Sequence, residues 1–146
     1  MSVGLLDVNV LVALFDPEHV YHDAAHAWLE DNRGQGWATC PITENGLVRV
    51  LSNPGYRREP PAAADVLKSL AAFRSSGGHE FWPDDISLCD PSRLASKAVL
   101  TGRQITDAYL VALAVGHGGR LVTFDLMIAI SAIAGAVKQH VCLVRG

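Results

Sequence analysis

Four acidic residues stand where a predicted strand ends or the next helix begins: Asp7, Glu44, Asp107 and Asp125. Carboxylates gathered in a half-buried cleft repel one another and lose hydration, so a fold that keeps them together balances them with a cation. Oxygen ligands without histidine or cysteine at matching spacing favour Mg²⁺ or Mn²⁺ over zinc. Such an ion leaves positions open for phosphate oxygens, the usual arrangement for phosphodiester hydrolysis. We therefore predict that these four acids are both the metal ligands and the catalytic residues.

The segment from Gly102 to Asp125 predicts how two of these acids meet. Its pattern favours an apolar helix over 108–115 and a buried strand over 121–124. A helix that begins at Asp107 descends ~15 Å at ~1.5 Å per residue, and the strand that leads to Asp125 rises ~16 Å at ~3.3 Å per residue. Asp107 and Asp125 should therefore finish at the same end of the molecule.

The rest of the chain alternates short strands with helices. We expect strands over 3–6, 37–40, 79–82 and 137–144, and helices over 10–15, 21–32, 42–53, 61–75 and 92–100. This alternation predicts a parallel sheet with right-handed crossovers and helices on both faces. The expected fold class is α/β: a three-layer α/β/α sandwich around a mainly parallel, twisted sheet of four or five strands, formed by one domain over residues 1–146. Functional groups gather at the carboxyl ends of such strands.

Several polar residues near the acids have expected structural roles. Asn9 is predicted to cap the helix over 10–15, with a supporting role in the acid site as a second possibility, and Thr106 is predicted to cap the helix over 108–115. Thr123 stands two residues before Asp125, on the same side of its strand, where it can reach a metal-bound water or a phosphate.

Composition sets limits on the class of protein. With 49% hydrophobic and 18% charged residues the chain should fold, and a net charge of −3 excludes nucleic-acid binding by bulk positive charge. No segment reaches the ~20 apolar residues of a membrane span, and residues 1–15 lack the basic start of a signal peptide. The three cysteines are scattered, which argues against a disulfide framework or structural zinc site and favours a reducing, cytoplasmic location.

Simpler interpretations exist for each acid taken alone. Glu44 and Asp107 could be favoured in the first turn of a helix by its dipole, and Asp7 and Asp125 could form turns. A receiver-like signalling domain also gathers acids over Mg²⁺, but it expects paired acids after the first strand and a lysine near the end of the last one. Asp7 has no acidic neighbour, and Lys138 lies at the other end of its strand. A degenerate domain that only binds a partner is a further alternative.

Three segments resemble PIN domains: LLDVNVLVALF at 5–15, TENGLVRVLSNPG at 43–55 and ITDAYLVALAVGHGGRLVTFD at 105–125. The likeness covers nearly the whole chain and is closest to the ribonuclease toxins of VapBC toxin–antitoxin modules. It implies that the four acids form the metal site, and that the protein cleaves RNA with Mg²⁺ or Mn²⁺. It also implies a homodimer that an antitoxin inhibits and that does not act at a membrane. A PIN nuclease outside a toxin–antitoxin pair, or one directed at DNA, remains an alternative.

One segment departs from these toxins. After the last aspartate they often carry a further polar or acidic residue and an aromatic one, whereas this chain has Leu126, Met127 and Ile128.

Other candidate residues carry less specific signals. HDAAH at 22–26 lacks the glutamate of a zinc-protease motif, so His22 and His26 are expected on an exposed helix face. Arg57 and Arg58 lie in a loop where they could steer RNA, pair with an antitoxin acid, or remain solvated.

Overall fold

The computed structural model describes residues 2–96, 98–128 and 130–145, and its centre is a five-stranded parallel sheet in the order β3-β2-β1-β4-β5. The parallel sheet expected from the sequence is confirmed. Its strands are short: β1 (Gly4–Leu6), β2 (Trp37–Thr39), β3 (His79–Phe81), β4 (Arg120–Thr123) and β5 (Val141–Leu143).

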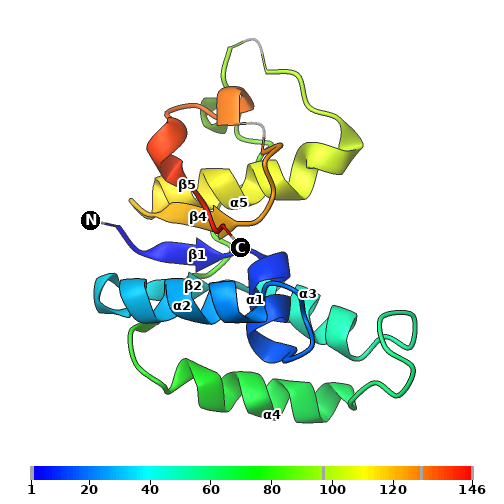
Figure 1. Ribbon diagram of the computed structural model, residues 1–146. Coiled ribbons are helices and arrows are strands. Elements are labelled where there is room, and N and C mark those ends of the chain that lie inside the picture. Colours follow the sequence, from blue (N-terminus) through cyan, green and yellow to red (C-terminus); the bar gives the residue numbers. More distant parts are fainter. Residues whose placement is uncertain (1, 97, 129, 146) are drawn as a thin grey trace.

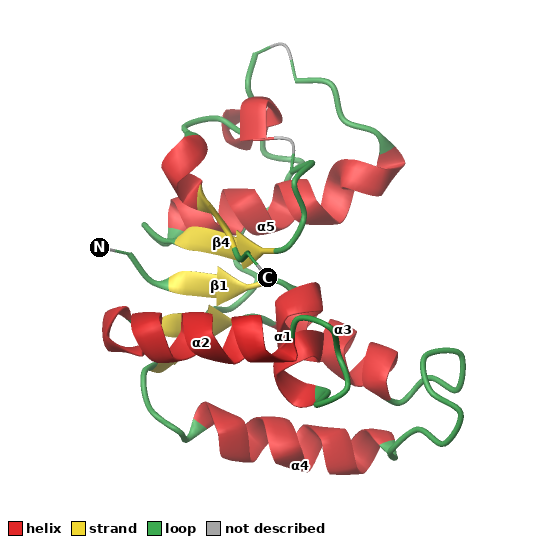
Figure 2. Cartoon of the chain, in the orientation of Figure 1, coloured by secondary structure: helices red, strands yellow, loops and turns green. Residues whose placement is uncertain are grey.

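Helices cover both faces of the sheet and complete the three expected layers (Figures 1 and 2). They are α1 (Val8–Phe15), α2 (His22–Asn32), α3 (Pro41–Leu51), α4 (Ala63–Arg74) and α5 (Ile105–Gly116). Successive strand residues point to opposite faces. Leu6 and Val122 accordingly pack with α1 to α4, whereas Leu5 and Leu121 pack with α5. The three central strands, β1, β2 and β4, are therefore buried on both faces, which explains why they are mostly apolar. Among the described residues no helix has the length and apolar character needed to span a bilayer.

The turn from β1 into α1 differs from the sequence prediction. Asp7, not Asn9, is the N-cap, and its carboxylate accepts a hydrogen bond of 2.8 Å from the amide of Val8. Asn9 lies inside α1 because Asp7 already has extended backbone geometry and satisfies the first free amide of the helix. The first candidate acid is therefore fixed by the same turn that starts α1.

The predicted exposed face for His22 and His26 is also corrected. Both rings are half-buried and donate hydrogen bonds to the last carbonyls of α1, His22 to Ala13 at 2.7 Å and His26 to Leu14 at 2.9 Å. The two histidines therefore join α2 to the end of α1, where carbonyl groups lack partners within the helix.

The predicted helix over 92–100 is wrong; residue 97 lies outside the described residues. Only a 3₁₀ turn forms there, over Pro91–Arg93. The backbone beyond it pairs with the segment 132–134 instead, since Ala95 donates to the carbonyl of Ala132 and Ala134 donates to that of Arg93. These long-range partners replace the hydrogen bonds that a helix would have needed.

The start of α5 lies earlier than predicted. A 3₁₀ turn over Gly102–Gln104 leads into the helix, and the Gln104 side chain accepts from the amide of Thr101 at 3.0 Å. Thr106 is consequently within the helix and is not its cap. The end of α5 is as expected, because Gly118 adopts a left-handed conformation with φ of 67°.

Candidate active site at the carboxyl ends of the strands

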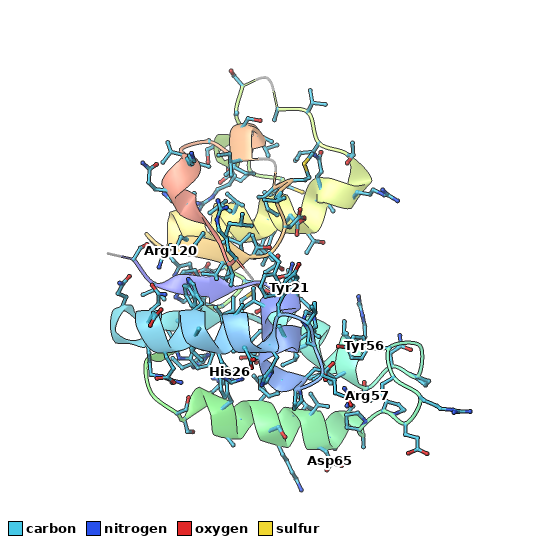
Figure 3. All side chains as sticks on the ribbon, in the orientation of Figure 1. Tyr21, His26, Tyr56, Arg57, Asp65 and Arg120 are labelled. Atoms are coloured by element: carbon cyan, nitrogen blue, oxygen red, sulfur yellow. The ribbon has the colours of Figure 1, made fainter. Side chains whose placement is uncertain are left out.

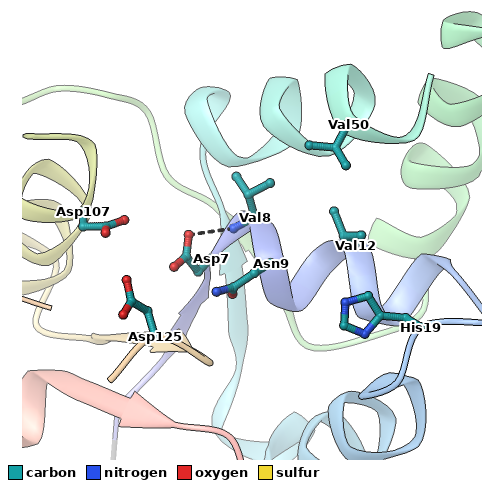
Figure 4. Close-up of a pocket in the computed structure, with 8 residues that line it drawn as sticks. All are labelled: Asp7, Val8, Asn9, Val12, His19, Val50, Asp107 and Asp125. Carbon is teal, nitrogen blue, oxygen red and sulfur yellow. Dashed lines mark hydrogen bonds between the residues drawn. The ribbon is translucent and has the colours of Figure 1, made fainter. Parts of the chain in front are cut away.

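Three of the four predicted acids meet in one pocket of about 390 Å³ (Figure 4). Asp7 arrives from the end of β1, Asp107 from the first turn of α5, and Asp125 from just beyond β4. The pocket is lined by Asp7, Val8, Asn9, Val12, His19, Val50, Asp107 and Asp125. The antiparallel course of α5 and β4 returns Asp125 to the level of Asp107, as the sequence predicts.

The electrostatics of this pocket favour protons or a cation. Burial raises the pKa of Asp7, which is only 7% exposed, and the Asp125 carboxylate adds to the effect; hydrogen bonds from Thr123 and the Val8 amide act in the opposite direction. Burial, the charges of Asp7 and Asp125, and a hydrogen bond with Asp125 raise the pKa of Asp107 to about 6. The pocket therefore concentrates negative charge at a cost that a bound cation would relieve.

A buried hydroxyl, that of Thr123, connects three of the pocket's residues. Its Oγ1 donates to the Asp7 carboxylate at 2.7 Å and accepts from the Asp125 amide at 3.0 Å. It also accepts from Asn9 Nδ2 at 3.4 Å. The sequence predicts that Thr123 reaches a water or phosphate, but its only proton is committed to Asp7. Its role in this structure is to hold the pocket's side chains in place.

The chemistry of the pocket fits a hard divalent cation. Three carboxylates supply oxygen ligands, and Asn9 Oδ1 is buried in the pocket wall without a hydrogen-bond partner. As the side chains stand, no three acidic, histidine or cysteine residues within the described ranges come close enough together to hold one ion. The residue types therefore fit Mg²⁺ or Mn²⁺, and binding would require the carboxylates to move closer together.

Glu44, the fourth predicted acid, lies outside this pocket. Its carboxylate pairs with Arg74 at 3.2 Å and accepts a hydrogen bond of 2.6 Å from Thr39. The helix period explains the difference: Asn45 and Arg49 point from α3 toward Asp7, and Glu44 is turned about 100° away from Asn45. In this arrangement Glu44 belongs to the same sheet edge but faces α4.

A second hollow of about 490 Å³ continues the cleft along α3 and contains residues that the sequence analysis missed. It is lined by Asp7, Val8, Ile42, Asn45, Gly46, Arg49, Val50, Thr106 and Asp107. Arg49 is an exposed cation on the wall opposite the acids. The spacing of Asn45 and Arg49, which places both on one helix face, was the available signal.

Gly46 allows α3 to approach this close to α1. A Cβ atom at Gly46 would lie 2.5 Å from Cγ2 of Val8, a distance that stiff, branched side chains cannot accommodate without movement. The glycine therefore sets how near Arg49 stands to Asp7.

Arg57 has a structural partner. It pairs with the buried carboxylate of Asp16 at 2.5 Å, and Tyr56 donates to the same carboxylate at 2.5 Å. Burial alone would raise the pKa of Asp16, but hydrogen bonds from Tyr56, the Glu18 amide and Arg57 outweigh it and keep this pKa below its ordinary value. Arg57 therefore fastens its loop to the end of α1, whereas Arg58 is exposed.

The unusual segment after Asp125 contacts the site through a backbone amide. The Asp125 carboxylate accepts a hydrogen bond of 2.8 Å from the amide of Met127. The side chains of Leu126 and Met127 are 77% and 81% exposed. Most of the surface of these two side chains is therefore in contact with solvent.

Comparison with known proteins agrees with this architecture. The protein-family model described as "PIN domain" matches residues 4–134 of this chain. Ribonuclease VapC44 of Mycobacterium tuberculosis is 47% identical over 137 residues, which are 94% of this chain and 96% of that protein. Ribonuclease VapC39 of the same organism is 49% identical over 135 residues, 92% of this chain and 97% of that protein. A crystal structure of VapBC2 from Rickettsia felis bound to a DNA fragment from their promoter shares the fold, with a TM-score of 0.58, 16% identity, and coverage of 85% of this chain and 89% of that one.

Proposed function

The chain belongs to the PIN-domain family, and from that premise we propose that it is an endoribonuclease that hydrolyses RNA with Mg²⁺ or Mn²⁺. The observation that carries the proposal is the pocket shared by Asp7, Asp107 and Asp125. Relatives at this level of identity over nearly their full length are named ribonucleases, which supports RNA as the substrate.

Each site residue has a distinct role in this proposal. Asp7, Asp107 and Asp125 would hold the ion, with Asn9 Oδ1 as a neutral oxygen donor and Glu44 as a fourth acid if it leaves Arg74. A bound divalent ion supplies Lewis acidity toward a phosphoryl oxygen and lowers the pKa of water. Thr123 fixes the orientation of Asp7 through its donated hydrogen bond.

Arg49 supplies the positive charge that an RNA phosphate needs beside this acidic pocket. It stands on the α3 wall of the cleft, where the second hollow also touches Asp7 and Asp107. A guanidinium group can bind two phosphate oxygens at once, so Arg49 would orient the RNA backbone across the acids.

We also propose that the protein is the toxin of a toxin–antitoxin pair and forms a homodimer. The VapC names of the relatives and the shared fold of the VapBC2 complex from Rickettsia felis support an antitoxin partner. Co-expression with the small protein of a neighbouring reading frame should yield a complex, and sedimentation of the purified chain should give twice its 15.6 kDa mass. A neighbour that never co-purifies, or a chain that sediments as a monomer, would contradict the respective part.

The experiment that tests the nuclease assignment is cleavage of RNA by the purified protein with Mg²⁺, Mn²⁺ or a chelator. We expect Asp7→Asn and Asp125→Asn to lower the rate at least ~100-fold, because the site loses a charged ligand while the neutral isostere preserves the packing. Asp31→Asn, which changes an exposed acid on α2, is the matched control. Full activity of folded Asp7→Asn would overturn the assignment, and equal cleavage of DNA would contradict the choice of substrate.

A further inference from the structure

Three aromatic rings, those of His19, Tyr21 and Phe124, continue the wall of the acid pocket toward the surface. The centroids of His19 and Phe124 are 6.3 Å apart with nearly parallel planes, and those of Tyr21 and Phe124 are 5.0 Å apart. His19 lines the pocket together with Asp125 (Figure 4), and Phe124 directly precedes that aspartate. This aromatic cluster thus begins inside the pocket and reaches Tyr21, which is 40% exposed. Tyr21, labelled in Figure 3, directly precedes α2.

The outer end of the aromatic cluster opens into a further hollow of about 370 Å³. Tyr21 and Phe124 form one part of it, and the remaining lining consists of Leu126, Leu143, Val144 and Arg145. An adjacent hollow of about 250 Å³ places Arg145 and Lys138 beside Asp125. One cation, Arg145, therefore lines the same hollow as Tyr21 and Phe124, and a second, Lys138, lines the adjacent hollow that Asp125 also lines, in a chain whose net charge is −3.

The combination of aromatic rings and cations fits one class of ligand, single-stranded RNA. Single-stranded RNA presents flat bases joined by phosphates, and proteins bind it by stacking bases on aromatic side chains and pairing the phosphates with cations. The hollow lined by Tyr21 and Phe124 lies next to the acids, because Phe124 directly precedes Asp125. An RNA strand whose phosphate lies over Asp125 would therefore place the neighbouring nucleotide in this hollow. An apolar protein segment would account for the rings but not for Arg145 and Lys138.

Because the aromatic cluster is continuous with the acid pocket, we propose that His19, Tyr21 and Phe124 form a stacking surface for one nucleobase beside the cleaved phosphodiester. In this proposal Arg145 and Lys138 contact phosphates. The inference rests on the proposed ribonuclease function and adds a subsite to it. The amide of Tyr21 donates to His19 Nδ1 at 3.0 Å, which fixes the turn that holds the two rings beside each other.

The test compares Tyr21→Leu and Tyr21→Phe on an RNA that the wild-type protein cleaves at one mapped bond. Stacking on an aromatic ring is worth ~1–3 kcal/mol per base, so we expect Tyr21→Leu to raise KM about tenfold with kcat within about twofold. Tyr21→Phe keeps the ring and should match the wild type. The control is Phe81→Leu, which removes a ring of similar exposure, 43%, from the other edge of the sheet.

Substrate changes show whether the effect belongs to a base. RNA with an abasic nucleotide next to the cleaved bond should bind the wild type about tenfold more weakly, and Tyr21→Leu should lose little further, because the two changes remove the same contact. Arg145→Ala should make KM less dependent on salt, since one phosphate contact is lost.

Three results would overturn the stacking surface while the nuclease assignment stands. The first is an unchanged KM for Tyr21→Leu on intact RNA, and the second is a Tyr21→Leu protein whose binding of RNA is still weakened about tenfold by the abasic nucleotide. The third is a Tyr21→Leu protein that loses dimer or antitoxin binding but has normal RNA kinetics. The last result would assign these rings to a protein interface. A wild-type protein that cleaves no RNA would overturn both proposals together.

Discussion

The hydroxyl of Thr123 on β4 donates a 2.7 Å hydrogen bond to the carboxylate of Asp7 beyond β1. The bond joins the ends of two adjacent parallel strands whose register pairs Leu6 with Val122. The same oxygen accepts the amide of Asp125, so one buried side chain sets the relation between two acids. The spacing of the proposed metal ligands therefore depends on strand register and on a side chain that carries no charge.

Thr123→Val tests this positioning role, because it removes the hydroxyl with little change in shape. We expect cleavage to fall at least about tenfold, as is usual when a group that supports a metal ligand is lost. The hydrogen bond favours the ionised form of Asp7, so its loss should raise the pKa of Asp7 and move the acidic limb of the pH–rate profile to higher pH. Thr123→Ser should retain both rate and profile. An unchanged acidic limb in a folded Thr123→Val protein would contradict the role.

The metal-free protein should become less stable as the pH rises through the range in which Asp107 titrates. The pKa of Asp107 is about 6 in the folded state and 3.8 ordinarily, so between these values the folded state binds more protons than the unfolded state. The free energy of unfolding consequently falls with increasing pH across this window. Melting temperatures in chelator from about pH 4 to about pH 7 measure the effect. Asp107→Asn should flatten the curve, and an identical slope in that variant would contradict the assignment.

Metal binding should be visible in thermal stability without any substrate. An ion that binds only the folded state adds ~2.7 kcal/mol at a hundred times its Kd, which for this chain length is roughly 5–10 °C. Asp125→Asn removes one repelling charge and keeps an oxygen that can accept from Met127, so in chelator it should melt no lower than the wild type. It should also lose most of the response to Mg²⁺ or Mn²⁺, whereas Asp31→Asn should keep it. A lower melting point with a full metal response would show that Asp125 only closes a turn.

Elements with strong local patterns are predictable from the sequence, and those set by distant contacts are not. The apolar α5 and β4 follow directly from residues 105–123. The predicted helix over 92–100 fails because Ala95 bonds to Ala132, a partner that no local pattern reveals. Asn9 precedes an apolar run, which favours a role as cap, yet Asp7, two residues earlier, already has the required geometry.

The same limit applies within the site. The convergence of Asp107 and Asp125 follows from helix and strand lengths, since both belong to one continuous unit. The direction of Glu44 depends on Arg74, which belongs to α4 and has no fixed relation to α3 in the sequence. The spacing of Arg49 and Asn45 places both on one face of α3, but the sequence does not show that this face lines the cleft. The position of the His19 ring is not predictable from the sequence either, because it depends on how the turn between α1 and α2 packs.

Glu44 requires its own test, because the sequence predicts a fourth ligand and the structure pairs it with Arg74. We expect Glu44→Gln to lower cleavage about tenfold, less than Asp7→Asn, since changes just outside a metal's direct ligands typically cost 10–100-fold. Arg74→Ala is the matched variant: it removes the ion pair and leaves the Glu44 carboxylate in place. The pair is partly exposed, so this loss should cost no more than ~1 kcal/mol of stability and leave kcat within about twofold.

The variants Glu44→Gln and Arg74→Ala show whether Glu44 is a metal ligand or only the ion-pair partner of Arg74. A Glu44 that serves the metal site predicts reduced cleavage and a weaker thermal response to Mg²⁺ in Glu44→Gln alone. A Glu44 that serves only to hold α4 predicts equal losses of stability in Glu44→Gln and Arg74→Ala, with cleavage and metal response intact in both.

His79 provides a useful internal reference. Burial and the nearby Arg74 lower its pKa to about 4. Its Nε2 lies 2.7 Å from the Thr39 hydroxyl, which also donates a hydrogen bond to Glu44. Removing Arg74 should therefore raise the pKa of His79, which NMR titration can follow. If His79 shifts in Arg74→Ala while Glu44→Gln keeps full activity, the prediction of a fourth acidic ligand is wrong.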